Sequence, residues 1–445
     1  MPAGNLEKLK YAIAYGADAV YAWVPMFSLR ARENQFTWET LAEGVEYCHS
    51  RGKKIYFTAN IYAHNVKIKP FMAAFEKMQS LKPDAYIMSD PGLIHLVREQ
   101  FPDAEIHLSV QANNTNWAQA KFWKSLGITR IILSRELSLK EVREIHEMCP
   151  EIEIEFFVHG AICMAYSGRC LLSNYFSHRD PNQWTCAHSC RWEYKVFKKD
   201  ATDEELYDST GRPEDYTPLK WEFYLEEKER QWEMIPIDED EYGTYIMNSR
   251  DICLLSYMQE LADAGVISFK VEWRSKTVNY LAWVGRAYRV ALDAVEKNEP
   301  YDAVELSKEV FAISNRWYTP GFLVGNPGEK AIYFEKNIDL HEEEPVGIVK
   351  WYDPINKMAR IEVKNRIDLK DKLILLSPTQ RLSFELESII ADPILLSDPT
   401  SELASFDTVP VNGNHRESGH GGHIDLWINV PEEPALYAII RKSNI

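Results

Sequence analysis

The chain has 445 residues with 45% hydrophobic and 26% charged side chains, which excludes a disordered or collagen-like protein and indicates a globular one with two or three domains. Its formal charge of -17 counts against a nucleic-acid partner without excluding one, because residues 200–241 alone hold 16 acidic and four basic side chains. No apolar run approaches the ~20 residues of a membrane helix, and no signal-peptide pattern opens the chain, so we expect a cytoplasmic protein.

The first 275 residues alternate short β-branched or aromatic runs with amphipathic helical stretches, which is typical of parallel βα units. Six to eight such units favour an α/β fold with a closed TIM-like (β/α) barrel, and a doubly wound open sheet is the alternative. The predicted strands are Ala17–Val24, Lys54–Asn60, Ala85–Asp90, Glu105–Gln111, Arg130–Arg135, Glu153–His159, Thr244–Ser249 and Ser268–Glu272. The predicted helices are Trp38–Arg51, Lys69–Leu81, Leu93–Phe101, Asn116–Leu126 and Leu139–Met148.

Two counts of barrel strands stay open. Pro2–Asn5 has the composition of a turn that leaves a strand, although only Met1 precedes it, and this indicates that a first strand is missing. In that case the segment near Thr244 need not belong to the barrel.

Beyond a helical stretch at Ser275–Ser314 and a turn-rich segment at Gly325–Gly328, the pattern changes to short alternating strands. We therefore expect a barrel domain over residues 1–335, with an acidic insertion near 200–241, and a small C-terminal β-barrel over 336–445. Its predicted strands are Val346–Trp351, Met358–Val363, Lys372–Leu376, Leu382–Leu386, Thr408–Val411 and Ile424–Val430.

Polar side chains stand where the predicted strands end, and in a barrel these ends surround the mouth of the active site. Each one taken singly suits an ordinary turn or helix cap, whereas the set together suits a polar or anionic ligand. The residues are Asn60, Asp90, Gln111, Arg135, Glu136, His159, Asn248, Ser249, Glu272 and Arg274.

Four of the seven cysteines lie within 28 residues, directly after the sixth predicted strand: Cys163, Cys170, Cys186 and Cys190. A disulfide framework is not expected in a reducing compartment, so the clustered thiols indicate an iron–sulfur or metal site. Their gaps of six, fifteen and three residues do not match a zinc ribbon, but spacing alone leaves structural zinc and free buried thiols open. Cys253 is a further candidate ligand, whereas Cys48 and Cys149 lie in predicted helices and are expected to pack as small hydrophobic side chains.

Several segments together resemble the collagenase-like peptidase family U32, in particular its tRNA hydroxylation branch. They are Pro2–Asn5, His107–Gln111, His159–Ser173, Ser177–Gln183, Cys186–Trp192, Asn248–Leu254, Lys270–Ser275 and Tyr318–Phe322. The resemblance spans nearly the whole chain. It implies an RNA hydroxylase that uses a 4Fe-4S cluster and prephenate, not molecular oxygen, to make 5-hydroxyuridine at the wobble position of tRNA. An electron-donating or assembly partner is left open.

The resemblance implies that Cys163, Cys170, Cys186 and Cys190 hold the cluster, with Cys253 as the alternative fourth ligand. Candidates for chemistry at the mouth are His159 and Glu272, and candidates for binding the prephenate dianion are Arg135, Arg169, Arg191 and Arg274. Tyr166, Tyr175, Phe176 and Trp192 are candidates for stacking a splayed base.

The chain departs from the family pattern by placing tryptophan where glycine is usual, at Trp23, Trp184, Trp273 and Trp317. Because glycine serves positive φ or close backbone approach, we expect strain or overpacking at these positions, and impaired activity.

Two other functions stay open from the sequence. A peptidase has neither an HExxH nor a GxSxG motif to use, although Cys163 with His159 could form a cysteine nucleophile and base. The other is a non-catalytic RNA-binding module with a structural metal, in which the C-terminal domain would bind the RNA. The segment His415–His423 is glycine-rich, and we interpret it as a hairpin loop in preference to a second metal site.

Overall fold

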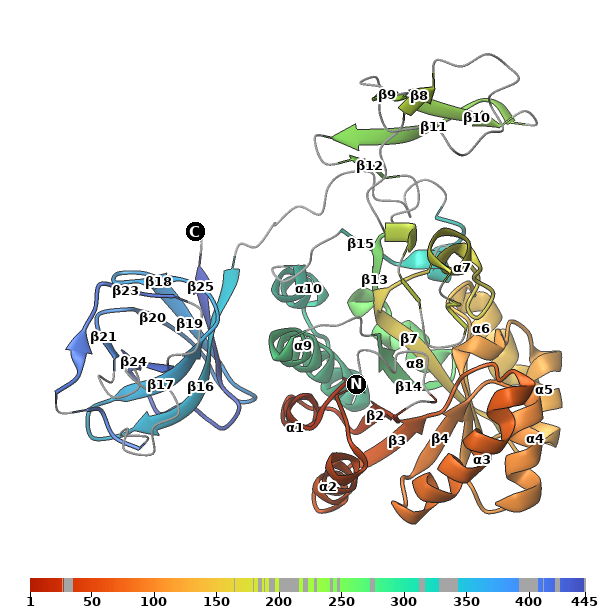
Figure 1. Cartoon of the computed structure of the whole chain (residues 1–445), viewed down its shortest axis with the longest axis horizontal. Coiled ribbons are helices and arrows are strands. Elements are labelled where there is room, and N and C mark those ends of the chain that lie inside the picture. The colour runs from red at the N-terminus through yellow and green to blue at the C-terminus, as the bar shows by residue number, and fades with distance from the viewer. Residues whose placement is uncertain are drawn as a thin grey trace.

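The computed structural model shows an α/β domain and a separate antiparallel β domain (Figure 1). It describes residues 1–25, 27, 35–163, 165–178, 180–182, 186–187, 189–191, 197–199, 216–218, 223–227, 230–240, 243–245, 249–272, 277–311, 317–327, 343–391, 407–410, 412–420 and 425–443. Among the helices so described, none combines the length and the apolar content that crossing a membrane requires.

The α/β domain is built on parallel strands that pair in chain order, each with the next, and β14 pairs with β7. The strands are β1 (Pro2–Ala3), β2 (Ala19–Trp23), β3 (Lys54–Thr58), β4 (Ala85–Met88), β5 (Ile106–Leu108), β6 (Arg130–Ile132), β7 (Glu153–Ala161) and β14 (Val266–Val271). This order confirms the predicted parallel βα units. Two further strands extend the sheet past β7: β13 (Asp251–Cys253) is antiparallel to β7, and β15 (Tyr318–Thr319) is parallel to β13.

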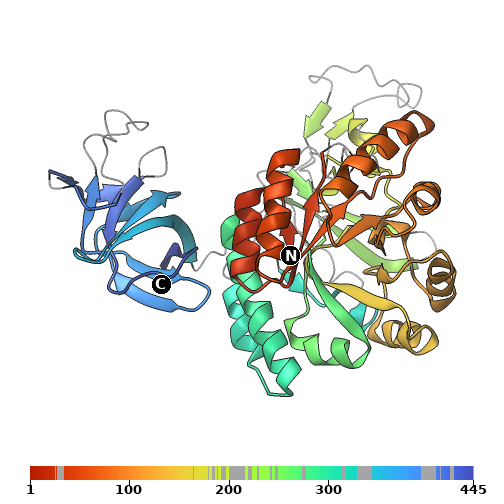
Figure 2. The ribbon, with the colours of Figure 1, turned by 90° about the horizontal axis from the view of Figure 1, so that it is seen from below.

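The helices lie around the outside of these strands, as Figure 2 shows. They are α1 (Leu6–Ala14), α2 (Trp38–His49), α3 (Asn65–Ser80), α4 (Pro91–Gln100), α5 (Trp117–Ser125), α6 (Leu139–Met148), α8 (Met258–Asp263), α9 (Val278–Lys297) and α10 (Ala303–Phe311). The main apolar core fills the space between the strands and these helices. A second cluster, which includes Tyr21, Tyr56, Ile132 and Phe157, lies on the inward faces of the strands.

Local sequence explains where several helices begin. Asp90 accepts hydrogen bonds from the backbone of Gly92 and Leu93 at the start of α4, and Pro91 occupies the first turn of that helix, where no backbone donor is needed. Ser138 and Glu141 form a reciprocal capping box at the start of α6. The polar strand end at Asp90 is therefore a helix cap.

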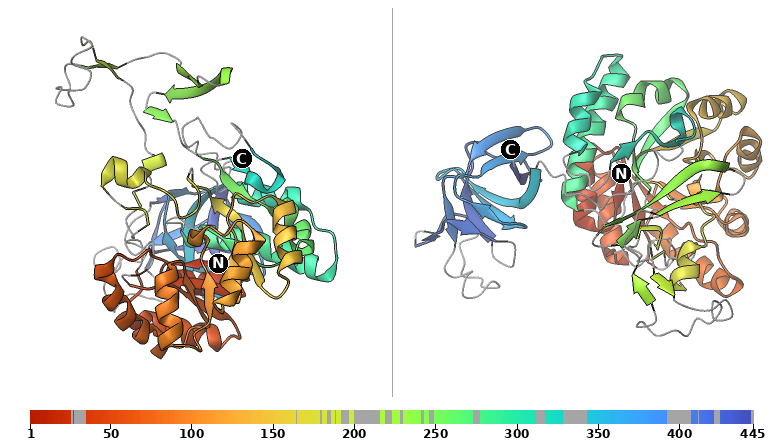
Figure 3. Two further views of the ribbon diagram at one scale, coloured as in Figure 1. Left: turned by 90° about the vertical axis from the view of Figure 1, so that its right-hand side faces the viewer. Right: turned by 90° about the horizontal axis from the view of Figure 1, so that it is seen from above.

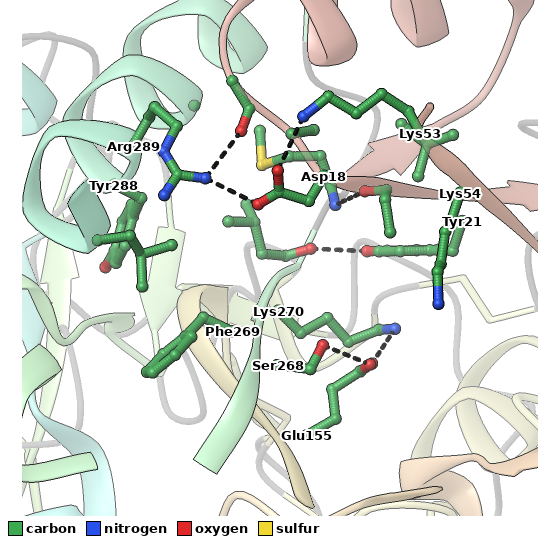
Figure 4. Close-up of a pocket in the computed structure, with 18 of the residues that line it drawn as sticks. Asp18, Tyr21, Lys53, Lys54, Glu155, Ser268, Phe269, Lys270, Tyr288 and Arg289 are labelled. Atoms are coloured by element: carbon green, nitrogen blue, oxygen red, sulfur yellow. Dashed lines mark hydrogen bonds and ion pairs between the residues drawn. The ribbon is translucent and has the colours of Figure 1, made fainter. Parts of the chain in front are cut away.

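The first strand is present but only two residues long, whereas β2 has five residues and β14 has six. Within the described residues no ladder joins β1 to β14, although the Tyr21 hydroxyl donates to the Val271 carbonyl across this gap at 2.7 Å. A cavity of about 520 Å³ lies there, lined by residues at the start of β2 and along β14 (Figure 4). The strands follow one another in the order found in a barrel, but the backbone pairing between β1 and β14 that would close it is not formed among the described residues.

The segment near Thr244 is not a strand of the barrel. It forms β12 (Gly243–Tyr245), which pairs with β11 (Arg230–Asp240) and not with the parallel strands. Together with β10 (Phe223–Glu227) these strands project beyond the α/β domain on the side of α7 (Leu172–Ser177), as Figures 1 and 3 show. Of the two candidate strands, β1 therefore belongs to the parallel sheet and the segment near Thr244 does not.

The C-terminal domain is an eight-stranded antiparallel sheet with its own apolar core. Its order is β20 (Arg381–Glu385), β19 (Lys372–Leu376), β25 (Ile439–Ser443), β16 (Glu343–Asp353), β17 (Met358–Val363), β24 (Asp425–Asn429), β21 (Ile389–Ala391) and β22 (Asn414–His415). The short strands β18 (Ile367–Asp368) and β23 (Ser418–Gly419) pair with each other. The prediction of a strand at Thr408–Val411 is wrong for residues 408–410, which are irregular, and β21 and β25 were not predicted.

The two domains share a small apolar cluster between α1, α9 and the strands of the C-terminal sheet. The Tyr15 hydroxyl lies 3.0 Å from the carbonyls of both Leu376 and Tyr437. Arg381 pairs with Glu309 of α10 at 2.8 Å. These contacts fix the C-terminal domain to α1, α9 and α10, away from the mouth of the barrel.

Candidate functional site

The carboxyl ends of the parallel strands form the face where barrel enzymes carry their chemistry. The segment after β7 lies over this face and carries the four clustered cysteines. It leaves β7 through Gly160, which has a φ of +106° and whose added Cβ would lie 2.8 Å from the Glu272 carbonyl oxygen. The Ser249 hydroxyl then donates to the Ile162 carbonyl at 2.6 Å, just before Cys163. The start of the cysteine segment is thus held against the neighbouring strands.

The middle of the segment is seated on loops that follow β3, β5 and β6. The Ser167 backbone donates to a Glu136 carboxylate oxygen at 3.0 Å. The Tyr62 backbone donates to the Asn182 carbonyl at 3.3 Å, and the Asn182 side chain donates to the Cys170 carbonyl at 3.1 Å. Because these partners follow different strands, the position of Cys170 depends on the loops after both β3 and β6.

Gly168 is the point of closest approach. Its φ is +76°, and an added Cβ would lie 2.0 Å from the Gln111 carbonyl oxygen. No side chain fits there without moving the cysteine segment or the end of β5.

We expect Gly168→Ala to lower the free energy of unfolding by about 1–3 kcal/mol more than Gly52→Ala does. Gly52 is the matched control, because it also has a positive φ, +65°, but nothing lies within 4 Å of its added Cβ. Urea unfolding of both variants measures the difference, which isolates steric contact from backbone strain. An equal loss of unfolding free energy in Gly168→Ala and Gly52→Ala would show that the cysteine segment can shift to accept a side chain at position 168.

The structure brings the thiols of Cys163, Cys170 and Cys186 within electrostatic range of one another. Burial raises the pKa of Cys170, the backbone N–H groups of Leu172 and Ser173 lower it, and the nearby Cys163 and Cys186 raise it. Cys190 lies on a short 3-10 turn, Ser189–Arg191, that packs against α7. The Ala187 backbone also donates to the Ser173 hydroxyl at 2.8 Å. The structure thus places Cys163 and Cys186 near Cys170, and it places Cys190 on a turn beside α7.

Thiolates are the ligands of iron–sulfur clusters and also of structural zinc, so the residue types on this segment suit either group. In the part of the chain that the structure describes, no three His, Cys, Asp or Glu side chains converge as ligands of one ion do. In a 4Fe-4S cluster four thiolates are needed, and hydrogen bonds to sulfur, such as those from Leu172 and Ser173, tune the cluster. The segment carries four cysteines: Cys163, Cys170, Cys186 and Cys190.

Cys253 has a different environment. It lies on β13 opposite His159 and beside the Tyr288 hydroxyl, at 3.7 Å from its sulfur, and burial raises its pKa. The Leu255 backbone N–H and the Tyr288 hydroxyl both hydrogen-bond to its sulfur and lower that pKa.

His159 is packed, not open to substrate. It is 1% exposed, its Nδ1 lies 3.3 Å from the Tyr288 hydroxyl, and its ring lies against those of Tyr280 and Tyr318. Tyr288 in turn donates to the Val158 carbonyl and accepts from the Leu254 backbone. Sequence reasoning missed Tyr288, whose signal is a hydroxyl on the buried side of the amphipathic helix α9.

Of the predicted arginines, Arg135 is buried at the mouth and pairs with Glu272 at 3.4 Å, so that each neutralises the other. Arg169 is exposed and lies over the ring of Tyr62, with 6.0 Å from guanidinium to ring centre. It lines a cavity of about 270 Å³ with Tyr62, His64, Gly168, Asp180 and Asn182. Arg191 is described only in its backbone, and Trp184, Trp192, Asn248, Trp273 and Arg274 lie outside the described residues.

Strain or overpacking is predicted at four tryptophans, and the positive φ that would cause backbone strain is not found at the two that the structure describes. Neither Trp23 nor Trp317 has a positive φ. Trp23 is buried at the end of β2, and Trp317 is 43% exposed with its ring near Phe311. Both are accommodated without a left-handed backbone.

The larger of the two cavities, at the gap between β1 and β14, is lined mainly by residues at the amino ends of the strands. Lys53 and Lys54 at the start of β3 and Arg130 at the start of β6 line it. Catalytic groups in barrels stand at the opposite ends. The mouth beneath the cysteine segment is therefore the candidate active site.

Comparison with known proteins identifies the family of the chain. Residues 4–333 match the model of Peptidase family U32. The chain is 40% identical over 453 residues to tRNA hydroxylation protein P of Escherichia coli strain K12, covering 99% of this chain and 96% of that protein. It is 42% identical over 460 residues to the protein of the same name from Haemophilus influenzae, covering 100% and 95%. A 23S rRNA 5-hydroxycytidine C2501 synthase of Escherichia coli is 32% identical over 294 residues, covering 66% and 39%. The chain belongs to peptidase family U32.

Proposed function

We propose that this protein hydroxylates the wobble uridine of tRNA to 5-hydroxyuridine, with a 4Fe-4S cluster as cofactor and prephenate as co-substrate. One observation carries the proposal. Four thiols stand on one segment over the mouth of a barrel, in a chain whose relatives over nearly its full length are named tRNA hydroxylation proteins.

The proposed cluster ligands are Cys163, Cys170, Cys186 and Cys190. When bound, the cluster supplies redox chemistry that amino-acid side chains lack. The protein contributes the Leu172 and Ser173 N–H groups beside the Cys170 sulfur and a segment held by Ser249 and Glu136. These contacts order the thiols before the cofactor arrives, which reduces the conformational entropy lost on binding.

The proposed prephenate ligand is Arg169. Its guanidinium is exposed at a cavity next to Cys170, and its planar fork suits a carboxylate. Arg135 is a poorer ligand because its charge is already balanced by Glu272. We assign Arg135 and Glu272 to holding the ends of β6 and β14, since Arg135 also donates to the Ala161 carbonyl at the end of β7.

A cysteine peptidase is disfavoured by the same geometry. A general base must reach both its nucleophile and the substrate, and His159 is enclosed by three tyrosine rings.

The test uses a strain that lacks its own tRNA hydroxylation genes and carries this gene on a plasmid. Mass spectrometry of digested tRNA is expected to show restored 5-hydroxyuridine, and no restoration in a parallel strain that cannot make prephenate. Soluble, iron-loaded protein without any restored nucleoside would contradict the proposal. Restoration that is independent of prephenate would contradict the co-substrate alone.

A further inference from the structure

Large apolar side chains are exposed on the cysteine segment itself. Tyr166 is 57% exposed, Leu171 70%, Tyr175 80% and Phe176 42%. Tyr166 lies between Cys163 and Cys170, and Tyr175 and Phe176 lie on α7, which follows Cys170 directly. Exposed aromatic groups gathered at one place mark an interaction surface more often than isolated ones do.

Tyr175 and Phe176 are in contact with each other. They meet edge to face, with ring centres 5.2 Å apart and planes at 87°, so this contact covers one face of only one of the two rings. Ser173 on the same helix is buried and accepts a hydrogen bond from the Ala187 backbone, so its side of α7 faces the loop beneath. The helix is thus anchored at Ser173 and presents Tyr175 on the opposite side.

The charge nearby suits a modestly anionic partner. Lys67 and Lys69 lie on the first turns of α3, which contain no acidic residue, and Arg169 follows Tyr166 closely in the chain. Asp180 offsets part of this charge and interacts with Lys67. A net charge of -17 disfavours binding of RNA through phosphate contacts alone, and contacts to bases add affinity that does not depend on charge.

We propose that Tyr166, Tyr175 and Phe176 form a stacking platform for unpaired bases of the tRNA anticodon loop. This inference rests on the proposed function and adds the surface that presents the loop to the mouth. Every base has a flat face, and aromatic side chains bind single-stranded RNA by stacking on it. A base in a duplex is covered on both faces and cannot use the platform.

The test measures binding of a fluorescent anticodon stem–loop to the full, anaerobically prepared chain. Tyr175→Ala and Tyr166→Ala are each expected to weaken binding about 10-fold, the loss of one stacked base. Tyr175→Phe is expected to bind like the parent because the ring is kept. Phe122→Ala is the matched control: Phe122 is 55% exposed, but it lies on α5. The 10-fold loss is expected at both low and high salt, because stacking does not release counterions.

Unchanged affinity in both alanine variants would overturn the platform, as would equal binding of a fully paired duplex. Reduced self-association of the variants, without loss of RNA affinity, would show a protein interface instead. Affinity is measured apart from hydroxylation, so the two proposals can fail separately. A parent chain that binds the stem–loop but makes no 5-hydroxyuridine contradicts only the reaction.

Discussion

Replacing Cys170 by serine is expected to abolish iron–sulfur loading and tRNA hydroxylation together. Cys170 lies near Cys163 and Cys186 and accepts hydrogen bonds from two backbone N–H groups, so its loss removes one ligand of the proposed quartet. A serine hydroxyl stays protonated at neutral pH and is a poor ligand for iron compared with a soft thiolate. Iron and sulfide analysis after anaerobic purification, with mass spectrometry of tRNA nucleosides, measures both losses.

Cys253→Ser is the matched control and is expected to keep iron and activity. Cys253 is half-buried beside Tyr288, and serine replaces it with little change in volume. A variant at Cys190 is expected to behave like Cys170→Ser. Loss of iron in Cys253→Ser with retention in Cys190→Ser would reverse the assignment of the fourth ligand. Full iron content in Cys170→Ser would contradict the quartet itself.

Much of the fold follows from local pattern. The alternation of apolar strands and amphipathic helices predicts the parallel βα units, and the caps at Asp90 and Ser138 mark where two helices begin. The number of strands does not follow from local pattern. The strand β13 depends on antiparallel pairing with β7, and β1 is recognisable only from its ladder to β2. Such pairings join residues distant in the chain and leave no periodic signal.

The candidate site also has features that the sequence predicts and features that only the fold reveals. Clustered cysteines are visible in sequence because their ligand chemistry needs only residue type and proximity along the chain. Arg135 and Glu272 were both predicted at strand ends, but their mutual neutralisation appears only when β6 and β14 are placed in one sheet. The tyrosine rings around His159 come from α9 and β15, so its burial could not be predicted from its own strand.

A charged cluster inside the barrel is the largest feature that sequence reasoning missed. Glu155 points inward from β7 and is 2.6 Å from Lys270, 2.8 Å from the Ser268 hydroxyl and 3.5 Å from Arg130 (Figure 4). Its side chain is 3% exposed. The carboxylate therefore balances two cations that have almost no access to water.

Glu155→Gln is expected to lower the free energy of unfolding at pH 7 by about 3–5 kcal/mol, because it leaves Lys270 and Arg130 buried without their counter-charge. Glu153→Gln is the matched control on the same strand. Glu153 also pairs with Arg130, at 2.7 Å, but its side chain is 48% exposed, so about 0–1 kcal/mol is expected. Urea unfolding of the two variants and the parent measures the difference. Equal losses would show that burial does not strengthen the Glu155 contacts.

The difference between parent and Glu155→Gln is also expected to depend on pH in one direction. Burial alone would raise the pKa of Glu155, but Lys270 and Arg130 lower it to about 2 from an ordinary value of 4.5. A carboxylate with a depressed pKa in the folded state stabilises the fold fully above its unfolded pKa, and this stability is lost as the pH falls toward the folded value. The free-energy gap is therefore expected to stay constant from pH 7 to about 5 and to narrow below that. A gap that widens on acidification would mean that Glu155 is protonated in the folded protein, so that its neighbours do not hold it ionised.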